Sequence, residues 1–195
     1  MLMVGSDLVG VERSLLSGGL SCPGCGGVLA PWGSSRWRSS RGAAGTVRHR
    51  PRRARCSWCG ITHVLLTQEW LVRRADAVAV IGAALEARAA GVGHRPIAAA
   101  LGRARSTVRG WLRRFACRAE QIRVHFTRLL HALDPSVSGL IPRNSVFADA
   151  VEALGAAAAA AVLRLSPTDP WAFASRATGG RLLWPAGVRA VCNTS

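Results

Sequence analysis

Four cysteines occur as two C-x-x-C pairs, Cys22 with Cys25 and Cys56 with Cys59. Two thiolates at this spacing can bind one metal ion from a single tight turn, and two such turns complete a tetrahedral shell. A glycine follows each pair, and glycine tolerates the left-handed backbone that closes such a turn. The pattern therefore predicts one structural Zn²⁺ held by four cysteines, because a closed four-sulfur shell leaves no position for a catalytic water.

Other interpretations of the cysteines are free thiols with no shared role and a thioredoxin-like redox pair. The redox interpretation is weaker because two pairs occur and neither lies in a strand-helix-strand pattern. His49 and His63 have the chemistry to replace a ligand, but four sulfurs already fill the shell, so we expect both to be ordinary polar residues. Apolar stretches at 28–30 and 64–66 follow the pairs and are expected to form strands of a small zinc ribbon.

The segment between the two pairs is rich in arginine, with tryptophan interleaved. Arginine binds phosphate through two parallel hydrogen bonds, so this segment is a candidate grip on a nucleic-acid backbone. We predict backbone contacts from its most concentrated part, which contains Arg48, Arg50, Arg52 and Arg53. The alternative is a solvated, mobile loop without contact to nucleic acid. The 30-residue span between the pairs is long for a zinc ribbon, and a flexible loop at 33–45 is expected to bulge out and accommodate it.

A helix-turn-helix pattern follows in residues 71–118. Its first part has apolar residues at helical spacing and ends at two glycines. A short helix is expected to begin near Pro96, since proline suits a first helical turn, and Gly102 permits the sharp turn after it. We expect Ser106 or Thr107 to cap the next helix.

The second helix of this motif has an apolar and a basic side. Four large apolar residues share its inward side, namely Val108, Trp111, Leu112 and Phe115. A helix with a basic outer side fits the major groove of DNA, with its N-terminal residues nearest the base edges. The predicted contacts are Arg105 and Arg109 to bases, Ser106 and Thr107 to base or phosphate, and Arg113 and Arg114 to the backbone. The alternative is a generic helical hairpin whose basic side is merely solvated.

The apolar spacing continues beyond Phe115 as far as Leu133, with a repeat of about 3.5 residues. The recognition helix is therefore expected either to run on as one long helix or to break briefly near Cys117. A further helix is predicted at 145–165, where alanine permits close packing. We expect these two helices to form an antiparallel hairpin, and the competing interpretation is a homodimer seam.

The chain carries 26 basic residues, all of them arginine, against 10 acidic ones, which gives a formal net charge of +16. Such a field attracts polyanions, so nucleic acid is the leading partner and an anionic membrane surface the second. No stretch approaches the roughly 20 apolar residues of a membrane span, and the start of the chain lacks a secretory signal. We expect a cytoplasmic, nucleoid-associated protein that does not enter a membrane.

The acidic residues do not indicate a catalytic centre. A two-metal nuclease or transposase needs carboxylates on strands that converge on Mg²⁺, whereas most of the carboxylates here lie in predicted helices. The sequence also has no G-x-x-x-x-G-K-[ST] phosphate loop and no G-x-S-x-G nucleophile elbow. The protein is therefore expected not to be an enzyme.

The predicted fold is mainly α, with a small N-terminal β zinc ribbon followed by a helix-turn-helix and a C-terminal helical hairpin. Its parts are a flexible leader at 1–20, the ribbon with its Arg-rich loop at 21–70, the helix-turn-helix at 71–118, a helical hairpin or dimerisation region at 119–165, and a loosely ordered tail at 166–195.

The motifs C-P-x-C-G, R-x-R-C-x-x-C-G and I-A-x-x-L-G-R-x-x-S-T-V-R-x-W-L-R-R-F give the chain a resemblance over about residues 20–120. It resembles the N-terminal DNA-binding regions of insertion-sequence transposases and, as a whole, small zinc-ribbon/helix-turn-helix proteins of GC-rich bacteria. The resemblance implies a sequence-specific binder of double-stranded DNA that acts as a transcriptional regulator, or as a transposition accessory factor beside a separate recombinase. The alternatives are the DNA-binding half of a split or truncated transposase and an RNA-binding zinc-ribbon protein.

Overall fold

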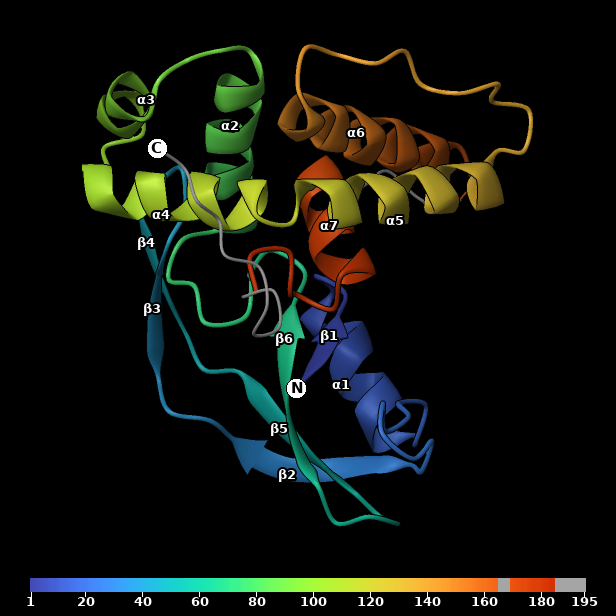
Figure 1. The fold of residues 1–195 in the computed structure, drawn as a ribbon. Coiled ribbons are helices and arrows are strands. Elements are labelled where there is room, and N and C mark those ends of the chain that lie inside the picture. Colours follow the sequence, from blue (N-terminus) through green and yellow to red (C-terminus); the bar gives the residue numbers. More distant parts are fainter. Residues whose placement is uncertain (165–168, 185–195) are drawn as a thin grey trace.

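The structure is a computed structural model that describes residues 1–164 and 169–184. A β region comes first along the chain and a helical region follows it (Figure 1). The strands are β1 (Leu2–Val4), β2 (Leu29–Ser34), β3 (Arg38–Arg41), β4 (Thr46–His49), β5 (Arg52–Cys56) and β6 (Thr62–Thr67). The helices are α1 (Leu8–Leu16), α2 (Val78–Ala89), α3 (His94–Ala100), α4 (Arg105–Ala116), α5 (Ala119–Leu133), α6 (Val146–Arg164) and α7 (Pro170–Ala177).

The β region consists of one sheet and one separate hairpin. The sheet has the order β1-β6-β5-β2, with β1 parallel to β6 and the other neighbours antiparallel. β3 and β4 pair with each other outside this sheet, and Arg41 of β3 also bridges to Asp76, so the segment expected to bulge as a loop is a two-stranded hairpin. The sheet closes over a small core that consists of Val4, Leu15, Cys22, Leu29, Ala54, Cys56 and Leu65.

The expectation of a flexible leader at 1–20 is wrong. β1 adds a strand to the edge of the sheet, and α1 covers the small core with Leu15, which is fully buried. Asp7 caps α1, because its carboxylate accepts hydrogen bonds from the backbone N–H groups of Val9 and Gly10 at 3.1 and 3.0 Å. The Asp7 cap and the spacing of Val11 and Leu15 are the sequence signals for this helix.

Helices α2, α3 and α4 form a three-helix unit around Ile81, Leu85, Ile97 and Phe115. Gly102 adopts φ +60° in the turn between α3 and α4, as the sharp turn predicted there requires. α4 ends at Ala116 and α5 begins at Ala119, so the helix breaks briefly near Cys117 and does not run on.

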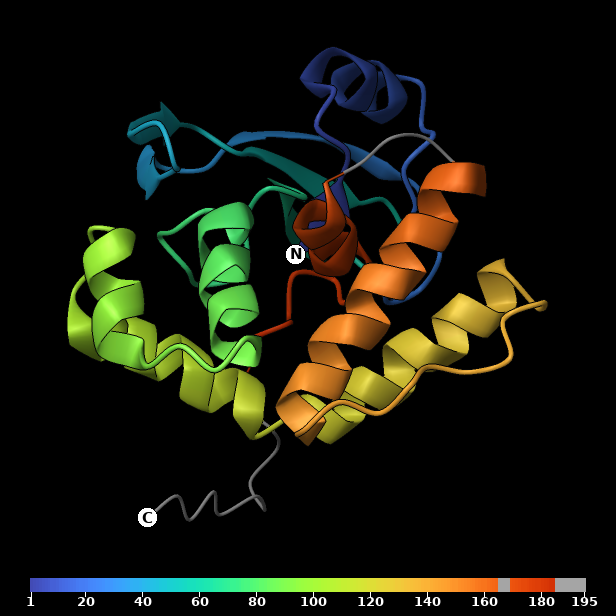
Figure 2. The same ribbon diagram turned by 90° about the horizontal axis from the view of Figure 1, so that it is seen from above.

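The expected antiparallel hairpin of the C-terminal helices is wrong, because α5 and α6 run side by side in the same direction (Figures 1 and 2). Phe115, just before α5, packs on Phe147 in the first turn of α6, with ring centroids 4.7 Å apart. The connection from 134 to 145 makes this possible. It can extend roughly 40 Å, and α5 is only about 22 Å long, so the chain returns to the start of α5 before α6 begins.

Helix α6 has the length and apolar composition of a membrane span, with a mean hydropathy of 1.8. No segment of this kind was expected from the sequence. Buried core helices share these properties. Ala150, Ala153 and Ala157 of α6 are fully buried in the helical core, so packing in this fold accounts for part of its composition.

The expectation of a loosely ordered tail at 166–195 is wrong for its described residues. Asp169 caps α7 by accepting from the N–H groups of Trp171 and Ala172, and Pro170 occupies its first turn, where a missing N–H costs nothing. Leu182 and Leu183 are buried in the helical core. Residues 165–168 and 185–195 lie outside the described part of the chain.

Trp171 anchors α7 to the helix-turn-helix unit. Its indole lies directly over Gly82 of α2, where a Cβ would overlap the ring, and its Nε1–H donates to Glu86 Oε1 at 2.7 Å. The missing side chain at Gly82 therefore leaves a notch in α2, and the tryptophan ring packs into this notch.

Replacing this glycine should be costly. Gly82→Ala is expected to lower the free energy of unfolding by about 2 kcal/mol, since the added methyl displaces a ring that a hydrogen bond holds in place. Gly155→Ala is the matched control, because Gly155 is a helical glycine in α6 with open space around its Cβ position. That control should gain about 0.5–1 kcal/mol from helix propensity. Chemical denaturation measures both, and equal effects of the two substitutions would contradict this packing.

Candidate metal centre and nucleic-acid interface

The four predicted ligands meet at one point. The sulfurs of Cys22, Cys25, Cys56 and Cys59 all lie within 4.8 Å of one another. Cys22 Sγ and Cys59 Sγ are 3.8 Å apart, and Cys25 Sγ and Cys56 Sγ are 3.4 Å apart. A tetrahedral Zn²⁺ with bonds of about 2.3 Å requires sulfurs about 3.8 Å apart, so the donor set fits such an ion.

The backbone of each turn prepares its first cysteine as a thiolate. The N–H of Cys59, followed by that of Trp58, lowers the pKa of Cys56 to about 6. The N–H of Gly24 likewise lowers the pKa of the Cys22 thiol from its ordinary value. These two thiols are therefore prepared as thiolates, the form that binds a metal, whereas, against the opposing N–H of Gly27, the hydrogen bond with Cys56 raises the pKa of Cys25 to about 12.

The two histidines near the site differ in their surroundings. His63 is buried, and its Nε2 lies 3.4 Å from Cys22 Sγ, so it packs against one of the four clustered sulfurs. The expectation that His63 is an ordinary polar residue missed this contact. His49 instead stacks on Trp70, with ring centroids 5.2 Å apart, outside the cysteine cluster.

The recognition helix has the two sides that the sequence predicts. Val108, Trp111, Leu112 and Phe115 are buried in the helical core. On the opposite side, four of the predicted DNA contacts are exposed: Arg105, Ser106, Arg109 and Arg113. The helix begins at Arg105 after Ala104, with no side-chain cap, so the expected cap by Ser106 or Thr107 is wrong because both lie inside the first turn.

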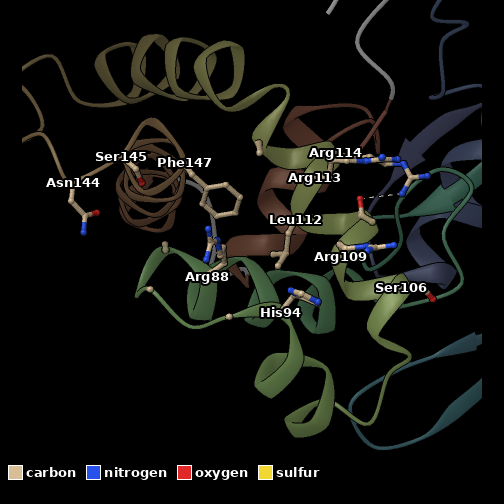
Figure 3. Close-up of a pocket in the computed structure, with 15 residues that line it drawn as sticks. Arg88, His94, Ser106, Arg109, Leu112, Arg113, Arg114, Asn144, Ser145 and Phe147 are labelled. Atoms are coloured by element: carbon tan, nitrogen blue, oxygen red, sulfur yellow. Dashed lines mark hydrogen bonds between the residues drawn. The ribbon is translucent and has the colours of Figure 1, made fainter. Parts of the chain in front are cut away.

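Two predicted contacts on this helix are less accessible. Thr107 and Arg114 are half-buried, and the Arg114 guanidinium donates to the carbonyl of Gly110 at 3.1 Å. Figure 3 shows this contact as a dashed line. Arg114 is therefore held along the helix surface.

A groove of about 970 Å³ runs beside the exposed side of α4. Figure 3 shows α4 on one side of it and the start of α6, with Asn144 and Ser145, on the other. The residues that line it include Arg88, His94, Arg109, Arg113 and Arg114 and no acidic residue. The charged side chains of the lining are therefore all basic, beside apolar ones such as Leu112 and Phe147, which suits an anionic ligand.

The arginines between the cysteine pairs have different surroundings. Arg48 is exposed and lies over the ring of Trp37 at 5.1 Å, and Arg50 is exposed and donates to the carbonyl of Ser35. Arg53 is half-buried. Arg52 donates to both carboxylate oxygens of Glu12, at 2.8 and 2.6 Å, so its guanidinium holds α1 on the sheet and we do not retain it as a DNA contact.

One polar residue that the sequence analysis did not select joins the two regions. Asp76 is buried just before α2 and pairs with Arg41 of β3 and with Arg103 of the α3–α4 turn, both at 2.7 Å. The sequence signal that could have identified Asp76 was its position as a single acidic residue close to arginines at the start of the helix-turn-helix.

The comparison with protein-family models bears on this helical unit. Residues 76–121 match the homeodomain-like domain. The matched segment covers α2, α3 and α4 and ends just inside α5. The match supports the helix-turn-helix prediction and indicates that this part of the chain binds DNA. No curated protein and no solved structure matches the chain.

Proposed function

We propose that this protein is a sequence-specific binder of double-stranded DNA that reads the major groove with α4, as a transcriptional regulator or a transposition accessory factor. One observation carries the proposal. α4 buries its apolar side in the core and exposes Arg105, Arg109 and Arg113 at a spacing of four residues, within a homeodomain-like domain. Residues four apart share one side of a helix, so these guanidinium groups can enter one groove together.

The groove beside α4 supports a path for the DNA backbone. Arg88 and His94 come from α2 and the start of α3, and Asn144 and Ser145 come from the segment just before α6. Cations and neutral donors of this kind hold phosphates and set the register of a duplex without reading its sequence. The base contacts are assigned to Arg105 and Arg109, because they lie in the N-terminal half of α4.

The cysteine cluster is proposed to bind one structural Zn²⁺ in a zinc ribbon. The observation behind this is the convergence of four sulfurs on a sheet whose own core contains only seven residues, two of them cysteines. The metal would supply stability, and its four-sulfur shell leaves no position for chemistry.

We propose a role without catalysis. Among the described residues, the four cysteines are the one cluster of side chains that could bind a metal ion. The carboxylates instead take part in separate structural contacts. Glu12, Asp76, Glu120 and Glu152 pair with arginines. The location is proposed to be the cytoplasm, on the nucleoid, with a separate recombinase and a second copy of the chain as further partners.

A competition titration tests the partner class. The full-length protein is bound to a labelled duplex at fixed salt and challenged with the same mass of unlabelled duplex, structured RNA or single-stranded DNA. Duplex DNA is expected to be the strongest competitor, since α4 is shaped for a groove about 12 Å wide. Displacement by RNA at lower concentration than by duplex would contradict the proposal and favour the RNA-binding alternative.

A further inference from the structure

The β3–β4 hairpin is fastened to the helix-turn-helix unit by a buried ionic joint. The Asp76 side chain is only 3% exposed, and its two oxygens accept separately from Arg41 and Arg103. Arg103 also donates to the carbonyl of Gly42 at the tip of the hairpin, at 3.1 Å. A buried carboxylate with two guanidinium partners fixes the relative position of the groups that it joins.

The backbone strengthens this joint. The N–H of Arg41 donates to the carbonyl of Ala75 at 2.6 Å, and the N–H of Ala77 donates to the carbonyl of Arg41 at 2.9 Å. His49, at the far end of β4, stacks on Trp70. The hairpin is therefore attached to the segment before α2 near both of its ends.

The hairpin so attached is strongly basic. It contains Arg38, Arg41 and Arg48, and residues 13–68 contain no acidic residue. Arg48 is exposed over the Trp37 ring, and the two residues between the glycines of the tip, Ala43 and Ala44, are small. A cationic hairpin with a small tip is able to approach a phosphate backbone without obstruction.

The joint also sets where this charge lies. Arg103 belongs to the turn that leads into α4, so the tip of the hairpin lies beside the N-terminal end of the recognition helix (Figure 1). In the proposed binding mode, that end of α4 is nearest the base edges. The hairpin arginines are then close to the backbone that borders the same base pairs.

We propose that the β3–β4 hairpin and α4 form one composite surface for duplex DNA, with Asp76 as the positioning residue that holds the hairpin in place. Arg38 and Arg48 bind phosphates beside the base pairs that α4 reads. This inference rests on the proposed function and assigns it a second contact region outside the homeodomain-like domain.

Footprinting of the full-length protein on its preferred duplex tests the composite surface. Arg38→Ala with Arg48→Ala removes two charges from the hairpin, and Arg13→Ala with Arg128→Ala removes two exposed charges from α1 and α5. The hairpin pair is expected to lose protection of the flanking backbone, and the slope of log K against log salt should fall by about 0.9 for each arginine. The α1/α5 pair should keep the full footprint.

Asp76→Asn tests the joint itself, since the buried Asp76 is not placed to touch DNA. It is expected to lose the same flanking protection and to speed amide exchange at Arg41, while the preferred base sequence stays the same. A merely structural defect would weaken the α4 contacts as well. If Asp76→Asn does not fold, the surface variants still decide the question.

The outcomes separate the two proposals. If the hairpin pair behaves like the α1/α5 pair, the composite surface is wrong and the reading by α4 is unaffected. If the unmodified protein binds no duplex, the proposed function fails. If Asp76→Asn keeps the flanking protection, Asp76 is not a positioning residue.

Discussion

Replacing Cys56 by serine is expected to unfold the β region and to abolish the proposed binding of Zn²⁺. Cys56 is buried in the small core, opposite Leu29 in the β2–β5 register. A sheet with so few buried residues does not gain enough from apolar burial to fold alone. Structural zinc supplies about 10–16 kcal/mol in zinc-finger peptides, so loss of one ligand is expected to remove the largest stabilising contribution to this region.

Hydrogen exchange with mass spectrometry, together with metal analysis, measures this effect. The amides of β2, β5 and β6 should lose protection in Cys56→Ser and in chelator-treated protein. Those of α2 and α4 to α6 should keep it, because their core is separate. Ser57→Ala is the matched control, since Ser57 lies in the same turn without being a ligand. One equivalent of zinc and native protection in Cys56→Ser would refute the proposed ribbon.

The second large effect is expected from Arg105→Ala with Arg109→Ala on α4. Both side chains are exposed, so the double variant should fold normally. Each bidentate contact to a base contributes about 1–3 kcal/mol of discrimination, which is roughly 5- to 150-fold in the affinity ratio between the preferred and a scrambled duplex. The double variant is therefore expected to lose most of its sequence preference while retaining salt-sensitive binding.

Arg113→Ala is the control for this prediction. Arg113 is exposed one turn further along α4 and is assigned to the backbone. Its loss should weaken binding to preferred and scrambled duplexes alike and reduce the salt slope by about one. Titrations of both duplexes at several salt concentrations measure the two variants. An unchanged affinity ratio in the double variant would show that α4 is not the reading element.

The helix-turn-helix was predictable because its signals are local. Gly102 marks the turn, and the spacing of Val108, Trp111, Leu112 and Phe115 identifies the buried side of α4. The convergence of the four cysteines was predictable for a different reason, since a closed metal shell requires the two pairs to meet whatever lies between them.

The features that the sequence did not reveal depend on contacts between distant segments. The direction of α6 relative to α5 is set by a connection long enough for either arrangement, so the apolar pattern alone does not decide it. Helix α7 is held by Trp171 in the notch at Gly82, across 89 positions of the chain. Asp76 joins two arginines, one 35 and one 27 residues away, and ion pairs of this kind leave no periodic signal.

Selection of bound sequences from a random duplex library tests the central claim most directly. The full-length, zinc-loaded protein is expected to enrich one recurring motif that contains guanine, the base that arginine contacts best in the major groove. The enrichment should disappear in Arg105→Ala with Arg109→Ala and persist in Arg113→Ala. A pool that stays random with the unmodified protein, or the same motif from the double variant, would contradict reading of DNA by α4.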